Sequence, residues 1–161
     1  MRFLAVLIGV LAIAATNSPG WQAFHTNGAE VRYPPSWHAT TRPLTSVTSP
    51  SELVAVASFA FPKRIVSDGC QPTGTLAKMQ PAGALIYAIE YASVVRKTDF
   101  PPRPKRLRLA RFWNYECFGR SYLLRFQERG RYFQLQVAFG RRATATTRAT
   151  TLQVINTFHA R

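Results

Sequence analysis

Two stretches near the C-terminus alternate between apolar and polar residues, and together they predict a β-hairpin. Apolar side chains occupy every second position over 122–126 and over 133–139. Because successive side chains of a strand point to opposite faces, this period predicts strands over 120–127 and 131–139. An even-length turn around Arg129-Gly130 places both apolar sets on one face, whereas a one-residue slip would turn every side chain over. The expected pairs are Phe126 with Phe133 and Leu124 with Leu135 on that face, and Arg125 with Gln134 and Leu123 with Gln136 on the opposite side, which is expected to stay out of the core.

The first two thirds of the chain carry further strand signals. Asn27-Gly28 is the strongest two-residue turn signal, because both positions tolerate positive φ, and it predicts a hairpin over 21–33. That hairpin pairs Phe24 with Val31 and His25 with Glu30, and Phe24 and Val31 are expected to be buried. An almost wholly apolar run over 53–61 predicts a strand buried on both faces. Between these hairpins we expect a short strand from Trp37 to about Arg42, a loop over 43–50, one or two helical turns over 75–79 and a strand over 84–91. An extended proline-rich segment is expected over 100–104. A half-exposed strand is expected over 105–112, because Leu107 and Leu109 alternate there with Arg106 and Arg108.

After Gly140 the apolar spacing changes from two residues to three and four. The residues that share this spacing are Ala145, Ala149, Leu152, Ile155 and Phe158. The pattern predicts that the chain ends in an amphipathic helix with Thr144 as its N-cap, packed on the sheet through Leu152, Ile155 and Phe158. Six or seven mostly sequential strands with one short and one terminal helix predict an α+β fold with a mainly antiparallel sheet.

An apolar run opens the chain. Residues 3–15 follow the positive charge of Arg2, and Ala12-Ile13-Ala14 satisfies the small-x-small rule of signal peptidase. Such a run reaches about 20 Å as a helix, less than the roughly 30 Å hydrocarbon core of a bilayer. The sequence therefore predicts a secretory signal peptide over 1–16, with an uncleaved anchor as the alternative. A single mature domain over 17–161, secreted or extracytoplasmic, monomeric and without an integral membrane span, is expected to follow.

Export decides how the two cysteines are interpreted. Cys70 and Cys117 would meet in an oxidising compartment with no third thiol to compete, which predicts a disulfide between them. Closing a loop of about 47 residues stabilises a fold by roughly 4 kcal/mol on a chain-entropy argument. Two isolated cysteines without nearby histidine or carboxylate ligands do not make a zinc site, and neither a metal nor another cofactor is expected.

Two segments carry a resemblance to a known group. The residues Tyr33, Pro34 and Trp37 match a Tyr-Pro-x-x-Trp turn, and 152–158 is similar to a closing helix that ends in a small polar residue and an aromatic one. Both resemble the PsbP-like/LpqN group of exported bacterial proteins. The resemblance implies an α/β/α sandwich around an antiparallel sheet and a non-enzymatic role in binding or assembly, with protein partners. It carries over no catalytic residue, and the lipid-attachment cysteine of the group's lipoproteins is missing here.

The charge is strongly unbalanced, with 21 Lys+Arg against 7 Asp+Glu and a formal net charge of +14 at pH 7. Seven of the cations fall within 96–111 against Asp99 alone. Such a field attracts polyanions, which outside a cell are wall polymers, lipid headgroups, acidic polysaccharides or DNA. The alternative is that arginine, which outnumbers lysine 17 to 4, reflects a GC-rich genome and only solubilises the surface. The candidate anion-binding residues are Arg106, Arg108, Arg125, Arg141 and Arg142. Arg141 and Arg142 precede the start of the predicted terminal helix, where free backbone N–H groups gather. These two side chains either point into solvent or hold an anion.

Motifs for catalysis are not found. The chain has no Walker loop, no His-Glu-x-x-His and no Gly-x-Ser-x-Gly sequence. Two histidines can act as general acid and base on a phosphodiester, so a small secreted hydrolase of the ribonuclease type remains the alternative, using two of His25, His38 and His159. The favoured interpretation is a non-catalytic binding or assembly protein of the cell envelope, whose partner is an anionic envelope polymer or another protein.

Overall fold

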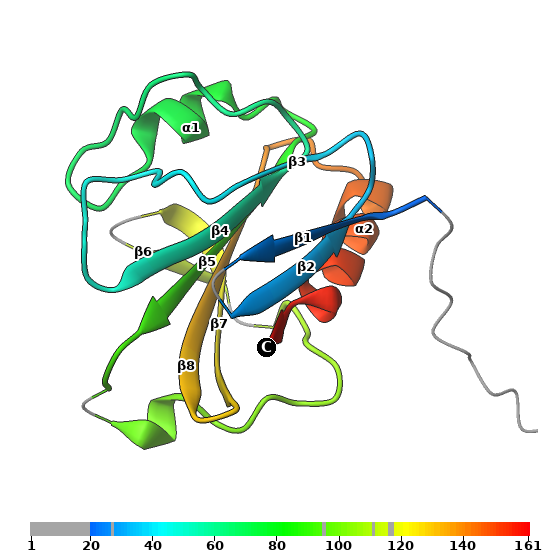
Figure 1. Cartoon of the computed structure of the whole chain (residues 1–161). Coiled ribbons are helices and arrows are strands. Elements are labelled where there is room, and N and C mark those ends of the chain that lie inside the picture. The colour runs from blue at the N-terminus through cyan, green and yellow to red at the C-terminus, as the bar shows by residue number, and fades with distance from the viewer. Residues whose placement is uncertain (1–19, 27, 95, 111, 116–117) are drawn as a thin grey trace, which may run out of the picture.

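The computed structural model of the protein describes residues 20–26, 28–94, 96–110, 112–115 and 118–161, and these form two antiparallel sheets with three short helical segments (Figure 1). The α+β class and the mainly antiparallel pairing are thereby confirmed. The larger sheet has the order β3 (His38–Thr40), β4 (Ser51–Ala57), β5 (Ala84–Tyr91), β8 (Arg131–Phe139), β7 (Gly119–Glu128), β6 (Phe112–Tyr115). The smaller has the order β1 (Gln22–Thr26), β2 (Ala29–Tyr33), β9 (His159–Ala160). The helical segments are α1 (Thr73–Lys78), the 3-10 turn η1 (Lys97–Asp99) and α2 (Ala145–Thr157).

The predicted register of the β7–β8 hairpin is confirmed. Phe126 lies opposite Phe133 and Leu124 opposite Leu135, with Arg125 opposite Gln134 on the other face. The turn needs two residues with positive φ to match the twist of the strands, and Arg129 (φ 53°) and Gly130 (φ 75°) supply them. The alternating pattern and the turn therefore determine this hairpin together.

The predicted N-terminal hairpin is also confirmed, with Phe24 opposite Val31 and His25 opposite Glu30. Gly28 has the positive φ of 82° that the turn requires, while Asn27 lies outside the described residues. Val31 is buried as expected, but Phe24 is only half-buried. Its strand, β1, is an edge of the three-stranded sheet, and Phe24 packs against the main core only from the margin.

Two strand predictions were wrong in extent. The strand expected over 53–61 ends at Ala57, although the apolar run continues. Phe59 and Phe61 instead pack beyond the strand end, in a second apolar cluster. The strand expected over 105–112 does not form, and β6 begins only at Phe112. The alternation of 106–108 is real, since Leu107 is buried between exposed arginines, but this segment follows its own path outside the sheet.

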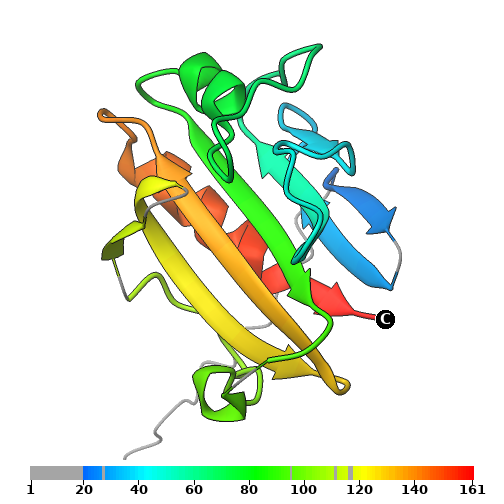
Figure 2. The same ribbon diagram turned by 90° about the vertical axis from the view of Figure 1, so that its left-hand side faces the viewer.

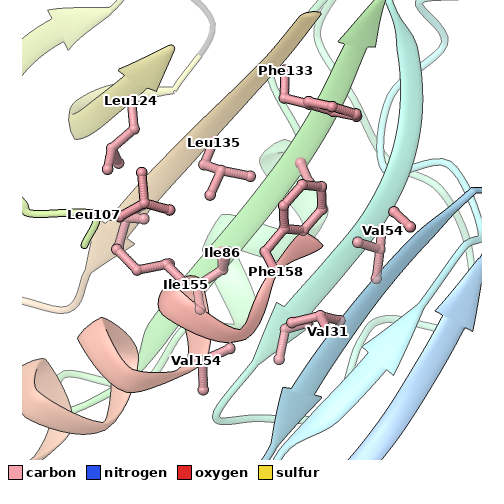
Figure 3. Close-up of a cluster of buried hydrophobic side chains, with 14 of the residues drawn as sticks. Val31, Val54, Ile86, Leu107, Leu124, Phe133, Leu135, Val154, Ile155 and Phe158 are labelled. Atoms are coloured by element: carbon pink, nitrogen blue, oxygen red, sulfur yellow. The ribbon is translucent and has the colours of Figure 1, made fainter. Parts of the chain in front are cut away.

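The main core lies between one face of the large sheet, the small sheet and α2 (Figure 3). Figure 3 shows Phe158 and Ile155 turned toward Phe133 and Leu135 of the sheet. The helix prediction is confirmed for Ile155 and Phe158, which are buried in the main core, but β9 follows α2, and the other buried positions of α2 are Thr151 and Val154. Leu152 is half-buried, and Ala145 and Ala149 are exposed. The buried residues of α2 all lie in its second half, and in the first half Arg148 places its guanidinium carbon 4.5 Å from the centre of the Phe139 ring of β8, so the first turns contribute no apolar stripe. Its N-cap is Thr144 as predicted, whose hydroxyl accepts the N–H of Thr147 at 3.1 Å.

The opposite face of the large sheet is buried as well, which contradicts the expectation for its polar positions. Gln134 and Gln136 are fully buried there. This face is covered by α1 and by loops that contribute Leu44, Phe59 and Phe118, so that α1 lies in front of the sheet and α2 behind it in Figure 2. The predicted register is correct. The wrong prediction concerns the layer of α1 and loops that covers this face, because alternation within a hairpin gives no information about what packs on its second face.

Candidate anion-binding groove

An open cavity of about 1060 Å³ lies between β7 and the segment 98–110 that precedes β6. Three of the five arginines predicted to bind anions line it, and they come from both sides. We call this cavity the β7 groove and define it by Asp99, Arg106, Arg108, Leu123, Leu124 and Arg125.

The β7 groove opens on the edge of a strand rather than on a face. Leu123, Leu124 and Arg125 are consecutive residues whose side chains alternate between the two faces, yet all three line the cavity. Among the described residues, strand β6 pairs with β7 from Gly119 to Tyr122, and Arg111, the next residue of that segment, lies outside them. The groove therefore lies along the side of β7 next to the end of the described β6 pairing.

In the described part of the chain, the backbone of the outer wall is hydrogen-bonded to the body of the protein at two places. At one end, the N–H of Gln127 donates to the carbonyl of Pro101 (2.8 Å) and the carbonyl of Gln127 accepts the N–H of Arg103 (2.9 Å). In the middle, the side-chain amide of Asn156 accepts the N–H of Leu107 (2.8 Å) and donates to its carbonyl (3.1 Å). These bonds satisfy the backbone of a segment that has no partner strand at Leu107.

Arg103 belongs to this support and not to the binding surface. Its side chain is only 10% exposed and donates to the carbonyls of Phe158 (3.0 Å) and Asn156 (3.3 Å). Burial lowers the pKa of Arg103 from its ordinary value, and the carboxylate of Glu128, 3.8 Å from its Nε, acts in the opposite direction. The guanidinium also lies 5.8 Å from the centre of the Phe126 ring. Arg103 thus fastens the wall to the C-terminal segment.

Arg125 is held in a fixed orientation at the inner wall. Its Nε donates to Oε1 of Gln134 (2.7 Å), and its guanidinium carbon lies 5.6 Å from the centre of the Phe100 ring. A second cavity of about 360 Å³, lined by Phe100 and Tyr91 among others, shares Arg125 and Asp99 with the β7 groove. With Nε occupied and one face on Phe100, the terminal amino groups of Arg125 make no hydrogen bond to any other described residue.

The positive charge of the groove is largely uncompensated. Arg106 and Arg108 are exposed and form no ion pair with a residue that the structure describes. Asp99 is the one acidic side chain among the described lining residues. The carboxylates that do form ion pairs, those of Glu30, Glu90 and Glu128, are engaged elsewhere, with Arg161, Arg131 and His159 among their partners. An anion entering the groove would meet three arginines and a single carboxylate.

Arg141 and Arg142 are not part of this groove. Both are exposed in the turn between β8 and α2, where the N–H of Arg142 donates to the carbonyl of Pro81 (2.7 Å). β8 continues for five residues beyond Gln134, the cross-strand partner of Arg125, which corresponds to roughly 17 Å along the strand before the turn that holds the pair. The five candidate arginines therefore divide into a groove set and a separate pair, and anion binding by the pair stays a prediction.

Two of the three histidines come to the same small sheet. His25 and His159 lie on opposite sides of Glu30 in the register of β1, β2 and β9, whereas His38 is on β3. The imidazole Nδ1 of His25 is 3.7 Å from Glu30, and that of His159 is 3.1 Å from Glu128. Both side chains are about half exposed, and neither lines the two cavities described above.

Two sequence predictions concern residues that the structure does not describe. Cys70 lies in the tight turn beside the Asp68–Gln71 bridge, but Cys117 lies outside the described residues, so their pairing stays a prediction. The predicted signal peptide over 1–16 lies outside them too. Among the helices that are described, none is long and apolar enough to cross a bilayer. In the same part of the chain no three histidine, cysteine, aspartate or glutamate side chains are grouped as metal ligands would be.

Sequence reasoning missed the residues that shape the groove. From the sequence, Asn156 is interpreted only as part of the polar and aromatic end of the terminal helix. Phe100 and Arg103 are interpreted as residues of a proline-rich surface segment. Their roles depend on contacts over 49 and 55 positions of sequence separation, for which no local pattern exists. Comparison with protein-family models, with curated proteins and with solved structures finds no match for this chain.

Proposed function

We propose that this protein is a secreted, non-catalytic binding protein that takes an anionic ligand in the β7 groove. The observation that carries the proposal is the meeting of Arg106, Arg108 and Arg125 around one cavity with a single opposing carboxylate. Arginine's planar fork of donors suits carboxylates, phosphates and sulfates, and a groove focuses the field of its charges on a ligand.

The proposed setting is the bacterial cell envelope, and the proposed fold type is the α/β/α sandwich of the PsbP-like group with its closing helix. The apolar run over 3–15 supports export. The positions of α1 and α2 on opposite faces of the large sheet support the sandwich. In that group binding or assembly is the expected role, which agrees with a groove for a partner or polymer.

The decisive comparison uses two double variants that remove the same charge. Arg106→Ala/Arg108→Ala removes exposed cations from the groove, whereas Arg141→Ala/Arg142→Ala removes two exposed cations outside it. With inorganic polyphosphate as the probe, the groove variant is expected to bind about tenfold more weakly than wild type, about 1.4 kcal/mol, and to show a weaker salt dependence. The control variant is expected to lose much less. Equal losses of affinity in the two double variants would mean that polyphosphate binds only through the diffuse positive charge of the protein, and would refute the proposal.

The hydrolase alternative predicts a different result. His25 and His159 would have to cleave a phosphodiester from the exposed face of the small sheet, where each already faces a carboxylate. We expect RNA and single-stranded DNA to remain intact with the purified protein, at the level of a His25→Ala/His159→Ala control. Cleavage above that control would replace the binding proposal with an enzymatic one.

A further inference from the structure

Two apolar side chains are exposed next to each other on the segment between β4 and α1. Among the described residues, the large apolar side chains that are exposed are those of Ile65 (47%), Val66 (55%) and Phe112 (48%). Ile65 and Val66 are consecutive, and they directly follow two exposed cations, Lys63 and Arg64. They line neither of the two cavities described above. We call Ile65 and Val66 the loop tip, which is an exposed apolar point beside positive charge.

The backbone of this loop is held on both sides of the loop tip. Before it, the guanidinium of Arg42 donates to the carbonyl of Lys63 (2.6 Å) and to that of Pro62. After it, the carbonyl of Val66 accepts the N–H of Gly74 in α1 (2.8 Å). A Cβ at Gly74 would lie 2.7 Å from the Cβ of Val66, so the close approach of loop and helix requires glycine there. The loop tip is therefore presented to solvent from a hydrogen-bonded backbone.

The loop tip belongs to one end of the large sheet, which we call the α1 end. Strand β4 leaves the sheet at Ala57, β5 enters it at Ala84 and β8 leaves it at Phe139, and the register places these three residues side by side. The segments 58–83 and 140–142 therefore leave or enter the sheet at this end. Figure 1 shows α1 there, at the top, and the turn between β7 and β8 at the opposite end.

The α1 end carries much more positive than negative charge. Its exposed cations come from the loop, from α1 and from the turn after β8, and they are Lys63, Arg64, Lys78, Arg141 and Arg142. Asp68 is the one carboxylate among the described residues of these segments. Glu116 lies outside the described residues, and an excess of three positive charges remains even when its charge is counted here.

An anionic lipid membrane complements both properties of this end. Its headgroups offer negative charge to the cations, and the acyl chains below them offer an apolar layer to Ile65 and Val66. A polyphosphate or an acidic polysaccharide would pair with the cations but has no apolar layer for the loop tip. Because the cations come from three separate segments, an extended charged surface matches them better than a compact ligand does.

We propose that the α1 end binds the surface of an anionic lipid membrane, with the loop tip inserted below the headgroups and the surrounding cations in contact with them. This inference goes beyond the proposed function, because it uses residues outside the β7 groove. Two small apolar side chains alone bind a bilayer weakly, so the apolar contact and the electrostatic contact are both required.

The first test separates the apolar contact from the charge. The probes are vesicles of phosphatidylglycerol and phosphatidylcholine in equal parts, and vesicles of phosphatidylcholine alone. Wild type is expected to bind the mixed vesicles at least tenfold more tightly than the neutral ones. Ile65→Ser/Val66→Ser keeps the net charge and is expected to bind the mixed vesicles at least tenfold more weakly than wild type. Ile65→Ser alone, which leaves the contact of Val66 with Gly74 in place, is expected to lose about threefold.

Two results of this test would overturn the proposal. The first is equal binding of wild type to the two kinds of vesicle, because the cations would then contribute nothing. The second is equal binding of wild type and both serine variants to the mixed vesicles. That result is also the one expected if the apolar run over 3–15, which all these proteins share, bound the vesicles instead.

The second test compares two double variants that remove the same charge from different places. Lys63→Ala/Arg64→Ala is expected to bind the mixed vesicles at least tenfold more weakly than wild type, and Arg106→Ala/Arg108→Ala less than about threefold. Equal losses would mean that only the net charge matters and would overturn the proposal. With polyphosphate the order of the two variants is expected to reverse, so failure of membrane binding and failure of the β7 groove are distinguishable.

The third test measures insertion at position 65. The fluorescence that Ile65→Trp adds to that of wild type is expected to shift to shorter wavelength on the mixed vesicles and to be quenched by bromine atoms on the acyl chains. Gln153→Trp, at an exposed position of α2, is the control and is expected to show neither change. Bound protein without quenching at position 65 would reject insertion of the loop tip and overturn the proposal.

Discussion

The side-chain amide of Asn156 satisfies both backbone polar groups of Leu107, at 2.8 and 3.1 Å, and so takes the place of a partner strand. Leu107 can therefore stay buried while Arg106 and Arg108 on either side reach the groove. One side chain of α2 thereby positions the outer wall of the proposed site.

Asn156→Ala is expected to lower the free energy of unfolding by about 1–3 kcal/mol, since it leaves two backbone groups of Leu107 without partners. Denaturant unfolding measures this change. Gln153→Ala, on the same helix but exposed, is the control and is expected to change stability by less than about 0.5 kcal/mol. Similar small effects of both substitutions would show that the wall does not depend on Asn156.

The sequence predicted those parts of the fold whose signals are local. Alternation and a two-residue turn are sufficient for the β7–β8 hairpin, because pairing follows directly from the turn. The same alternation at 105–112 was misinterpreted as a strand, since Leu107 is buried against the core with Asn156 in place of a strand partner. The burial of Gln134 also has no local signal, because it depends on which loops cover the second face of the sheet.

The candidate site was predictable in part. The arginine-rich stretch identified Arg106 and Arg108, and the hairpin register placed Arg125 on the opposite side of β7 from Leu124. Arg106, Arg108 and Arg125 line one cavity, whereas Arg141 and Arg142 do not. This division depends on the path that 98–110 takes between β5 and β6. This path is determined by contacts with α2 and with Gln127, which are distant in sequence.

Leu135 lies at the centre of the main core, fully buried opposite Leu124. Leu135→Ala is expected to lower the free energy of unfolding by about 2–5 kcal/mol, because the cavity left in a two-sided core cannot collapse fully. Leu152→Ala, which removes the same atoms from a half-buried position of α2, is expected to cost clearly less. Equal costs, measured by urea unfolding, would mean that α2 and not the sheet face is the centre of the core.

Because of Tyr87, the free energy of unfolding is expected to fall at alkaline pH. Burial raises the pKa of Tyr87 well above its ordinary value, and the negative charge of Glu52 raises it further. Below about pH 10 both the folded and the unfolded chain keep this proton, whereas above it only the unfolded chain loses it, so stability falls as pH rises. Between pH 10 and 11, Tyr87→Phe is expected to lose about 1 kcal/mol less unfolding free energy than wild type. Parallel profiles of the two proteins would contradict this account.

The disulfide between Cys70 and Cys117 is tested by counting thiols in the folded protein purified from an oxidising compartment. We expect no reactive thiol before reduction and two after it, with a loss of stability on the order of 4 kcal/mol and retention of the sheet signal in circular dichroism. Two free thiols in the unreduced protein would disprove the bridge.

The central claim is that an anion binds at the β7 groove and not over the basic surface at large. The most direct measurement is a titration of the isotope-labelled protein with inorganic polyphosphate, followed by amide and arginine side-chain resonances. The account predicts that the largest shift changes occur at the Nε–H group of Arg125 and at the amides of 106–108 and 123–125, and that they saturate together. Changes that are largest around Arg141 and Arg142, or spread evenly over exposed arginines without saturation, would contradict it.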